Sequence, residues 1–405
     1  MKPNKECYRS LPVKSTPVDN STINRLLEVE IDKISKLKKS AYEFGRSKRV
    51  TPLGVQSSFQ YYEPYPVSIR RGEGAYLYDV DGRKILDLSM GFGAMLAGHL
   101  NPIVVEELSR TLEDGTLFVA PSDSSREGAE SICKRFSLDW VRFCNSGTES
   151  VMYAVRLAKV HTGKKGVIKI EGGYHGSADS VNFSIKPWFD ITSVVDEYKP
   201  IYLSGSNEGL SYVVPFNDLR YLEELLSKEH KKISCLVIEP VIENLGIVLP
   251  VEGYLEGVRE LCSRYGVVLI FDEVKTGLTA GFRGAASRFN VTPDLICLAK
   301  SIGGGVPLAA FGGSDEFFNT ITTGKMSHYG TFNGNNLAMA GIRAMDRIAS
   351  DRTLKSAEKL NYKALDLITD IINEYELPAH TVGFGVKGAV SWSKEPILNY
   401  RDWLN

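Results

Sequence analysis

Short apolar runs alternate with longer amphipathic stretches between about residue 100 and about residue 335. An apolar run of about four to eight residues bounded by polar residues is typical of a buried strand, whereas apolar residues spaced three or four apart indicate a helix. The runs that predict strands are 141–144, 166–170, 235–238, 267–271, 294–298 and 308–312. Helical segments separate most of them, so the pattern predicts an α/β fold with a mostly parallel central sheet and helices on both faces.

The two ends of the chain have a different pattern. After a loose leader at 1–20, residues 21–46 carry apolar side chains at helical spacing, and 51–66 reads as a loop. Residues 74–88 alternate on both sides of an Asp81-Gly82 turn, which predicts a hairpin. We therefore expect a leader and helix at 1–45 and a large domain at 101–335. A smaller α+β domain would be formed by 46–100 and 336–405.

The composition excludes several classes of function. The 405 residues are 43% hydrophobic and 24% charged, with a formal net charge of -1, which gives no electrostatic reason to bind nucleic acid or an anionic membrane. No long uncharged apolar stretch is present, and the polar start lacks the apolar core of a signal peptide. The six cysteines form no Cys-x-x-Cys pair, and no cluster has metal-ligand spacing. We expect a cytoplasmic protein without a metal site.

The residues that follow each predicted strand carry the functional signal, because ligands of such sheets bind beyond the carboxyl ends of the strands. Ser146, Gly147 and Thr148 follow the strand at 141–144 and precede a helical run. Small residues at a strand-to-helix turn expose backbone N–H groups that bind an anion, and Thr148 adds a hydroxyl donor. An ordinary helix N-cap would use the same residue types.

Tyr174 and His175 follow the strand at 166–170 and stand among three glycines. An aromatic side chain here is suited to lie flat against a planar ring, and an imidazole is suited to hydrogen-bond or titrate near neutral pH. Taken alone, an ordinary core aromatic and a hydrogen-bonded histidine explain the two residues better than a binding site does.

Three further strand ends carry ionisable residues. Glu239 follows 235–238, Asp272 follows 267–271, and Lys300 follows 294–298 and precedes Gly303–Gly305. A carboxylate directly after an apolar strand is partly buried and needs a cation, either a protonated ring nitrogen or a nearby arginine. A lysine in a dry site loses its charge easily and becomes a nucleophile.

Together these strand ends provide the groups that pyridoxal 5'-phosphate (PLP) requires. The helix N-terminus suits the phosphate, and Tyr174 suits the ring. Asp272 suits the pyridinium nitrogen, and Lys300 suits the aldehyde, with which an amine forms a Schiff base. The glycines after Lys300 leave room for the cofactor. The joint occurrence of these residues in this order is far more specific than any one of them.

The sequence resembles the class III aminotransferases, which are fold-type I PLP enzymes. It is most similar to the branch that holds glutamate-1-semialdehyde aminomutase and related aminotransferases. The resemblance runs from about residue 45 to about residue 390. The motifs that carry it are, in order, Asn145–Glu149, Gly173–Gly176, Phe271–Gly277, Leu298–Gly305 and Gly330–Asn335.

The resemblance implies a role for each motif residue. Lys300 would form the Schiff base and move the substrate α-proton, and Asp272 would pair with the ring nitrogen. Tyr174 would stack on one face of the ring, opposite Val274. The other cofactor-binding residues that the family implies are Ser146, Gly147 and Thr148 at the phosphate, Asn244 at the phenolic oxygen, Glu239 and His175 as supporting groups, and Thr331 at the phosphate of the neighbouring subunit.

The chain departs from the family pattern in two places. Relatives in this branch carry an arginine that clamps the substrate carboxylate in the loop corresponding to residues 54–60, where this sequence has none. Arg70 and Arg71 lie at the hairpin entry, where we expect them to face solvent. The family also continues past the position of residue 405, so we expect a shortened or incomplete C-terminal part.

The function that we expect is an aminotransferase that moves an amino group from a small amino donor to an oxo acceptor in a ping-pong cycle. It would act as a homodimer with shared active sites. An intramolecular aminomutase of the glutamate-1-semialdehyde type would use the same residues, and a non-catalytic homologue is a third reading. The missing arginine leaves open whether the substrate lacks a carboxylate or another cation binds it.

Overall fold

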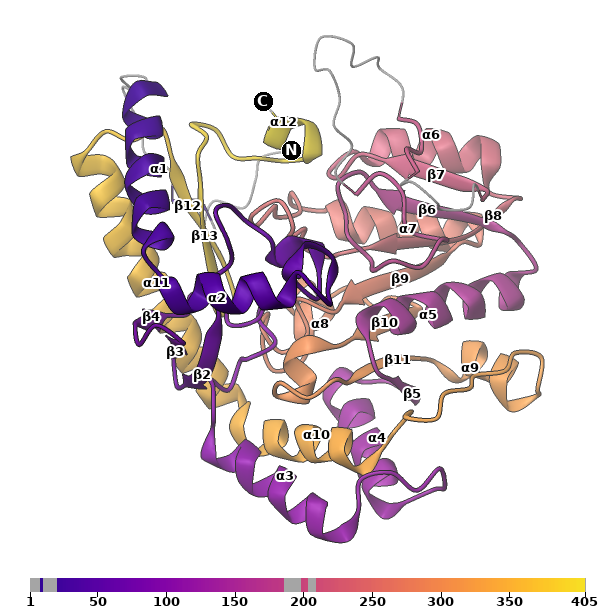
Figure 1. Ribbon diagram of the computed structural model, residues 1–405. Helices are drawn as coiled ribbons and strands as arrows, with labels where there is room; N and C mark the ends of the chain where they lie inside the picture. The colour runs from indigo at the N-terminus through magenta and orange to yellow at the C-terminus, as the bar shows by residue number, and fades with distance from the viewer. Residues whose placement is uncertain (1–7, 10–19, 186–197, 203–208, 405) are drawn as a thin grey trace.

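A seven-stranded sheet forms the centre of the computed structural model, which describes residues 8–9, 20–185, 198–202 and 209–404 (Figure 1). In spatial order its strands are β5 (Trp140–Cys144), β11 (Ala309–Gly313), β10 (Leu295–Leu298), β9 (Val268–Glu273), β8 (Ile233–Ile238), β6 (Gly166–Ile170) and β7 (Ser211–Val214). Neighbouring strands are parallel except where β11 pairs with β10 and β5. The predicted mostly parallel α/β sheet is confirmed.

Six of these strands coincide, within a few residues, with the apolar runs of the sequence. The seventh, β7, lies at the edge of the sheet and was not predicted. Only its last two residues, Val213 and Val214, are buried. Because a four-residue edge strand shows neither an apolar run nor a full alternation, its pattern alone does not distinguish it from a loop.

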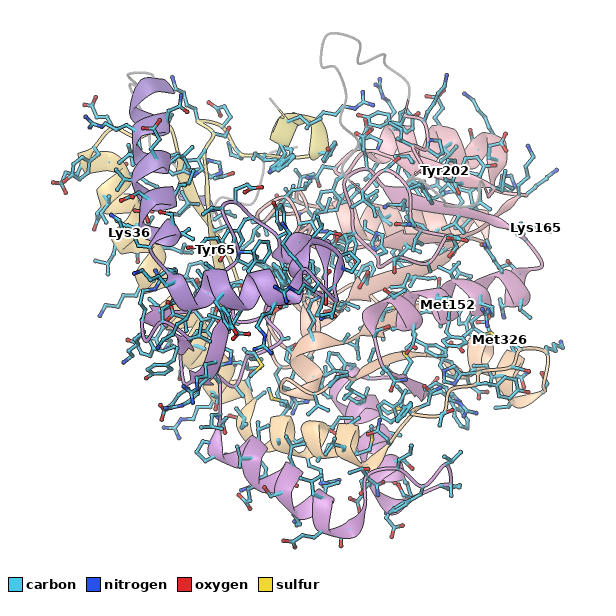
Figure 2. The ribbon with its side chains drawn as sticks, viewed as in Figure 1. Lys36, Tyr65, Met152, Lys165, Tyr202 and Met326 are labelled. Atoms are coloured by element: carbon cyan, nitrogen blue, oxygen red, sulfur yellow. The ribbon has the colours of Figure 1, made fainter. Side chains whose placement is uncertain are left out.

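Helices cover both faces of the central sheet, and strand β8 shows why its sequence is continuously apolar. Leu236 and Ile238 belong to a core with helices α6 and α7, whereas Cys235 and Val237 belong to the opposite core with α5. Met326 belongs to that second core, and Met152 of α5 packs against it (Figure 2). Burial on both faces leaves no position for a polar alternation.

The helices of the described chain have the following bounds: α1 (Asn20–Ser35), α2 (Lys38–Ser47), α3 (Pro102–Asp114), α4 (Asp123–Phe136), α5 (Gly147–Thr162), α6 (Leu219–Glu229), α7 (Tyr254–Tyr265), α8 (Gly284–Phe289), α9 (Asp315–Thr322), α10 (Asn336–Ile348), α11 (Asp351–Glu374) and α12 (Tyr400–Leu404).

The helix expected over 21–46 is two helices, α1 and α2, with a break near Leu37. The hydroxyl of Tyr65 donates to the carbonyls of Ile34 (2.8 Å) and Leu37 (3.3 Å). Asp81 accepts hydrogen bonds from the backbone N–H and the hydroxyl of Ser40 at the start of α2. Contacts from distant residues therefore terminate one helix and begin the next, which the local apolar spacing does not reveal.

Two small antiparallel sheets lie on the same side of the central sheet (left in Figure 1). One joins β2 (Ile69–Glu73), β3 (Tyr76–Asp79) and β4 (Lys84–Leu86), which confirms the predicted hairpin. The other joins β1 (Tyr8–Arg9), β12 (His380–Phe384) and β13 (Lys387–Ser391).

The ends of the chain bear on two further expectations. Strand β1 belongs to the expected leader, the rest of which lies outside the described residues apart from Asn20, where α1 begins. Arg70 and Arg71, in β2, are exposed, as expected. The proposed division into four domain segments stays a prediction.

Candidate active site

A cavity of about 350 Å³ opens at the carboxyl ends of strands β5, β6, β8, β9 and β10. Segments that are far apart in the sequence converge there, because parallel strands deliver their ends to the same edge of the sheet. Nine of the eleven predicted site residues line it, namely Ser146, Gly147, Thr148, Tyr174, His175, Glu239, Asp272, Val274 and Lys300.

One end of the cavity is formed by the start of helix α5. The Ser146 hydroxyl caps this helix by accepting from the backbone N–H of Glu149 at 3.2 Å. The N–H groups of Gly147 and Thr148 have no hydrogen-bond partner among the described residues. A Cβ on Gly147 would come within 3.0 Å of Val274. This turn is therefore a capped helix start that also has N–H groups without a partner among the described residues, so the N-cap does not exclude the anion-binding interpretation, which stays a prediction.

Tyr174 and His175 stand on the loop after β6. The backbone N–H of Tyr174 donates to Glu239 Oε1 at 3.0 Å, and its side chain is 42% exposed with no ring contact among the described residues. His175 is 1% exposed, and its Nδ1 lies 2.8 Å from Asp272 Oδ2. His175 Nε2 is buried and has no hydrogen-bond partner in the part of the chain that the structure describes. The Tyr174 ring is thus available for contact with a ligand, whereas His175 hydrogen-bonds to Asp272 and fixes its carboxylate.

Asp272 is 4% exposed near the end of β9. Besides His175, it accepts from the backbone N–H of Val274 at 3.0 Å. In the described part of the chain, no arginine forms an ion pair with it, so the alternative of a nearby arginine partner is excluded there. Burial raises the pKa of neighbouring Glu239, which is 3% exposed.

Lys300 begins the short turn Lys300–Gly303 directly beyond β10 and has a φ of 48°. Burial lowers the pKa of its amine, and the positive charge of Lys275 lowers it further. Its Nζ has no hydrogen bond or ion pair to any described residue. A Cβ on Gly305 would come within 2.8 Å of Met95 Sδ. Lys300 therefore lines the cavity with an amine whose pKa is lowered, and its role as a nucleophile stays a prediction.

Two lysines beside this cavity were not singled out from the sequence. Lys275 lines it, and its Nζ donates to Asn244 Oδ1. Lys387 of β13 pairs with Glu243 and donates to the Lys275 carbonyl at 2.8 Å. Lys275 occupies the variable position of the motif Phe271–Gly277, which was the only sequence signal for it.

The other two predicted residues lie outside the cavity lining. Asn244 does not line the cavity itself, but its Oδ1 accepts a hydrogen bond from Lys275, which does. Thr331 is exposed on the surface. A role at the cofactor of the same chain is therefore not supported for Thr331, which leaves the implied role at a neighbouring subunit as a prediction.

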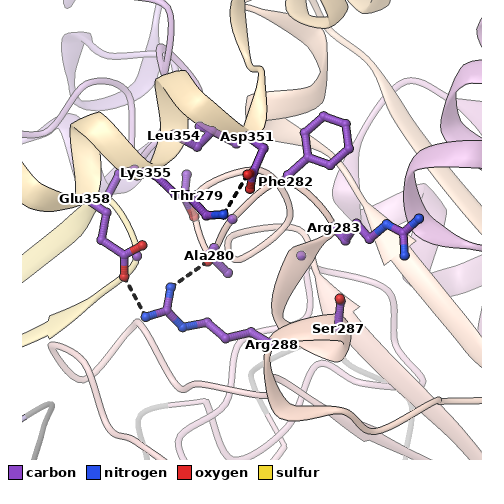
Figure 3. Close-up of a pocket in the computed structure, with 14 residues that line it drawn as sticks. Thr279, Ala280, Phe282, Arg283, Ser287, Arg288, Asp351, Leu354, Lys355 and Glu358 are labelled. Carbon is purple, nitrogen blue, oxygen red and sulfur yellow. Dashed lines mark hydrogen bonds and ion pairs between the residues drawn. The ribbon is translucent and has the colours of Figure 1, made fainter.

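A second cavity of about 450 Å³ lies between the loop before α8 and helix α11 (Figure 3). Arg288 pairs with Glu358 at 2.6 Å and donates to the Ala280 carbonyl at 3.0 Å. Lys355 pairs with Asp351 at 2.7 Å. These paired surface charges form no set of reactive groups, so the smaller cavity at the strand ends is the candidate active site.

The aminotransferase class-III family model matches residues 58–399. The chain belongs to the class III aminotransferase family. The resemblance inferred from the motifs is confirmed, and the family implies small-molecule substrates that carry an amino group. Among the described residues, no group of side chains could hold a metal ion, and no helix has the length and apolar character needed to cross a membrane.

Relatives within the family carry more than one activity name. The chain is 34% identical over 369 residues to a glutamate-1-semialdehyde 2,1-aminomutase of Desulfitobacterium hafniense, a match that covers 90% of this chain and 85% of the relative. It is similar to the crystal structure of an omega-transaminase from Sphaerobacter thermophilus, with a TM-score of 0.84, 33% identity, and coverage of 90% of this chain and 85% of that chain. A transaminase structure with PLP bound matches with a TM-score of 0.81 and 30% identity, over 86% of this chain and 82% of that chain.

Proposed function

We propose that this protein is a PLP-dependent aminotransferase whose active site is the cavity at the strand ends. The observation that carries the proposal is the meeting of Lys300, Asp272 and the start of α5 in one cavity. In the described part of the chain, these are an amine without a partner and with a lowered pKa, a buried carboxylate, and a helix N-terminus with free N–H groups.

The residues present fit PLP. The N–H groups of Gly147 and Thr148 suit a phosphate, and the absent side chain of Gly147 keeps that end open. Tyr174 offers the ring face that the family assigns to stacking. Asp272 offers a carboxylate that is already oriented by His175 and by a backbone N–H. A non-catalytic homologue would have no use for these features.

When bound, PLP supplies an aldehyde that condenses with amines and a ring that accepts electron density from the substrate carbon. Lys300 would hold the aldehyde carbon through its amine, and, when a substrate amine takes its place, would remove the proton from the carbon that bears the amino group. Asp272 would keep a proton on the ring nitrogen, and His175 would keep the Asp272 carboxylate in place. Thr148 would bind phosphate with its hydroxyl.

Lys275 places a positive charge at the cavity, where loop 54–60 lacks the arginine that binds the substrate carboxylate in relatives. Lys275 lines the cavity, and its hydrogen-bond partner is the neutral amide of Asn244 rather than a carboxylate. We propose that Lys275 is the alternative cation for a substrate carboxylate. Under this proposal the amino donor is an amino acid rather than a simple amine.

The aminotransferase proposal is tested by cofactor binding and by kinetics. The purified protein should develop a visible absorption band with PLP, and borohydride reduction should add the cofactor mass to the peptide that contains Lys300. Lys300→Ala should show neither change and should lose turnover by about 10³-fold or more. A wild-type protein that binds no PLP would overturn the proposal and favour a non-catalytic homologue.

Dependence on a second substrate separates the two enzymatic alternatives. An aminotransferase requires an added oxo acid to complete its cycle, and initial rates at several concentrations of both substrates should give the parallel lines of a ping-pong scheme. An aminomutase, the activity named for the relative of Desulfitobacterium hafniense, would instead turn over a single substrate without an added acceptor.

A further inference from the structure

A fully buried lysine lies directly beneath the loop that carries Tyr174 and His175. Lys169 is the fourth residue of strand β6, and its side chain is 0% exposed. Its Nζ donates to three backbone carbonyls, those of Gly173 (2.8 Å), Val181 (3.3 Å) and Phe183 (2.6 Å). An ammonium group has three N–H donors, so each of them has an acceptor here.

The three acceptors lie at the two ends of one segment. Gly173 immediately precedes Tyr174, and Val181 and Phe183 close the same loop on its return. One ammonium group therefore joins the start of the segment 173–183 to its end. Within that segment, the backbone N–H of Tyr174 contacts Glu239, and the ring of His175 contacts Asp272. Both carboxylates line the cavity.

An isolated charge in a strand core is costly unless polar groups compensate it. Burial lowers the pKa of Lys169 to about 7, whereas the nearby carboxylates of Glu239 and Asp272 oppose that shift. In the described chain no carboxylate pairs with its Nζ, and the Phe183 ring centroid lies 5.2 Å away. The hydrogen bonds to three backbone carbonyls are therefore what compensates this buried amine.

We propose that Lys169 is a positioning residue that closes the segment 173–183 and thereby holds Tyr174 and His175 at the cavity. The closing of the segment follows from the three hydrogen bonds alone and does not require that PLP binds. Its consequence for cofactor binding rests on the proposed function, because Tyr174 and His175 matter to PLP only if PLP binds in this cavity.

The proposal is tested with full-length Lys169→Met, which keeps the volume of the side chain and removes its donors. Hydrogen–deuterium exchange of the cofactor-free protein should be about tenfold or more faster at amides of 173–183, with little change in helix α7. The dissociation constant of PLP, measured from its absorption band, should rise about tenfold or more. Lys164→Met is the matched control, because Lys164 donates to the Gly266 carbonyl at 2.9 Å away from the cavity.

A core variant separates positioning from general destabilisation. Leu222→Ala, in α6, should lower the melting temperature and leave both local exchange at 173–183 and PLP affinity in the folded protein unchanged. If Lys169→Met does not fold, Lys169→Gln, which keeps two of the three N–H donors, takes its place, and exchange at 173–183 should still be faster than in the wild-type protein. Unchanged exchange at 173–183 would overturn the proposal.

Two further outcomes separate this proposal from the proposed function. Faster exchange with unchanged PLP affinity would also overturn it, because the loop would then move without affecting the cavity. If the wild-type protein binds no PLP, the proposed function fails, and the exchange experiment alone decides whether Lys169 closes the segment.

Discussion

Lys300 and Asp272 differ in how firmly neighbouring groups hold their side chains. Among the described residues the Lys300 amine has no partner, its pKa is lowered, and its backbone is held in the left-handed region at a φ of 48°. Non-glycine residues adopt that conformation at a cost of order 1–3 kcal/mol, which persists where the surrounding structure imposes it. Asp272, by contrast, is fixed by an imidazole and a backbone N–H. The reactive amine is left free while the groups around it are held.

Replacing Lys275 should change substrate choice more than catalysis in general. In Lys275→Met, kcat/KM for amino donors that carry a carboxylate should fall about tenfold or more, because a charge-assisted hydrogen bond is lost. Donors without a carboxylate should be much less affected. Steady-state kinetics with paired donors measures this, with exposed Lys325→Met as control. An equal loss for both kinds of donor would contradict the assignment of Lys275 as the carboxylate-binding cation.

Among the secondary-structure elements, helix α5 contributes most directly to the cavity. Its apolar face is buried against the sheet, so its N-terminus is fixed at the strand ends. The Ser146 hydroxyl caps the N–H of Glu149, and Gly147 and Thr148, whose N–H groups have no partner among the described residues, line the cavity. The Thr148 hydroxyl accepts from the backbone N–H of Ser177 at 3.3 Å, which leaves its own hydrogen available to a phosphate. A packed helix thus presents hydrogen-bond donors that suit an anion without any cationic side chain.

Removing the Thr148 hydroxyl tests the phosphate end of the cavity. Thr148→Val should raise the dissociation constant of PLP about tenfold, because one hydrogen bond to a charged group is lost. Binding of pyridoxal, which lacks the phosphate, should not change. Absorbance titrations with both compounds measure the difference, and Thr162→Val at the far end of α5 serves as control. Equal weakening of both ligands would place the phosphate elsewhere.

On the scale of the whole molecule, exposed apolar side chains gather on two neighbouring segments. Phe118 and Val119 are exposed, as are Tyr329 and Phe332 on either side of Thr331. The segments adjoin, because the backbone N–H of Asn336 donates to the Thr116 carbonyl at 3.1 Å. Exposed apolar groups that adjoin one another are typical of an interaction surface. We propose that a second copy of the chain covers this surface, consistent with the role implied for Thr331 at a neighbouring subunit.

The proposed homodimer is tested by mass in solution. Light scattering should give the wild-type protein twice the mass of one chain, and Phe332→Asp should shift it towards the monomer, because a buried unpaired charge disfavours an interface. Tyr375→Asp, at an exposed aromatic after α11, is the control and should stay dimeric. A monomeric wild-type protein, or a dimer that Phe332→Asp does not weaken, would show that this surface has another use.

The sequence by itself determined the order of strands along the chain, the small residues before α5, and the placement of Tyr174, Asp272 and Lys300 at strand ends. These features depend on local apolar patterning and turn chemistry, which neighbouring residues set. Because parallel strands share one edge, the sequence also implied that their ends would meet, and the cavity confirms it.

Only the tertiary structure decided which other groups reach that edge. Lys387 and the Lys275 carbonyl are 112 residues apart, and Lys169 is a single lysine in an apolar strand whose acceptors lie on the loop beyond it. The break between α1 and α2 likewise depends on Tyr65 and Asp81. Such contacts follow from how the elements pack and from the register of their strands, and no local pattern of apolar and polar residues encodes them.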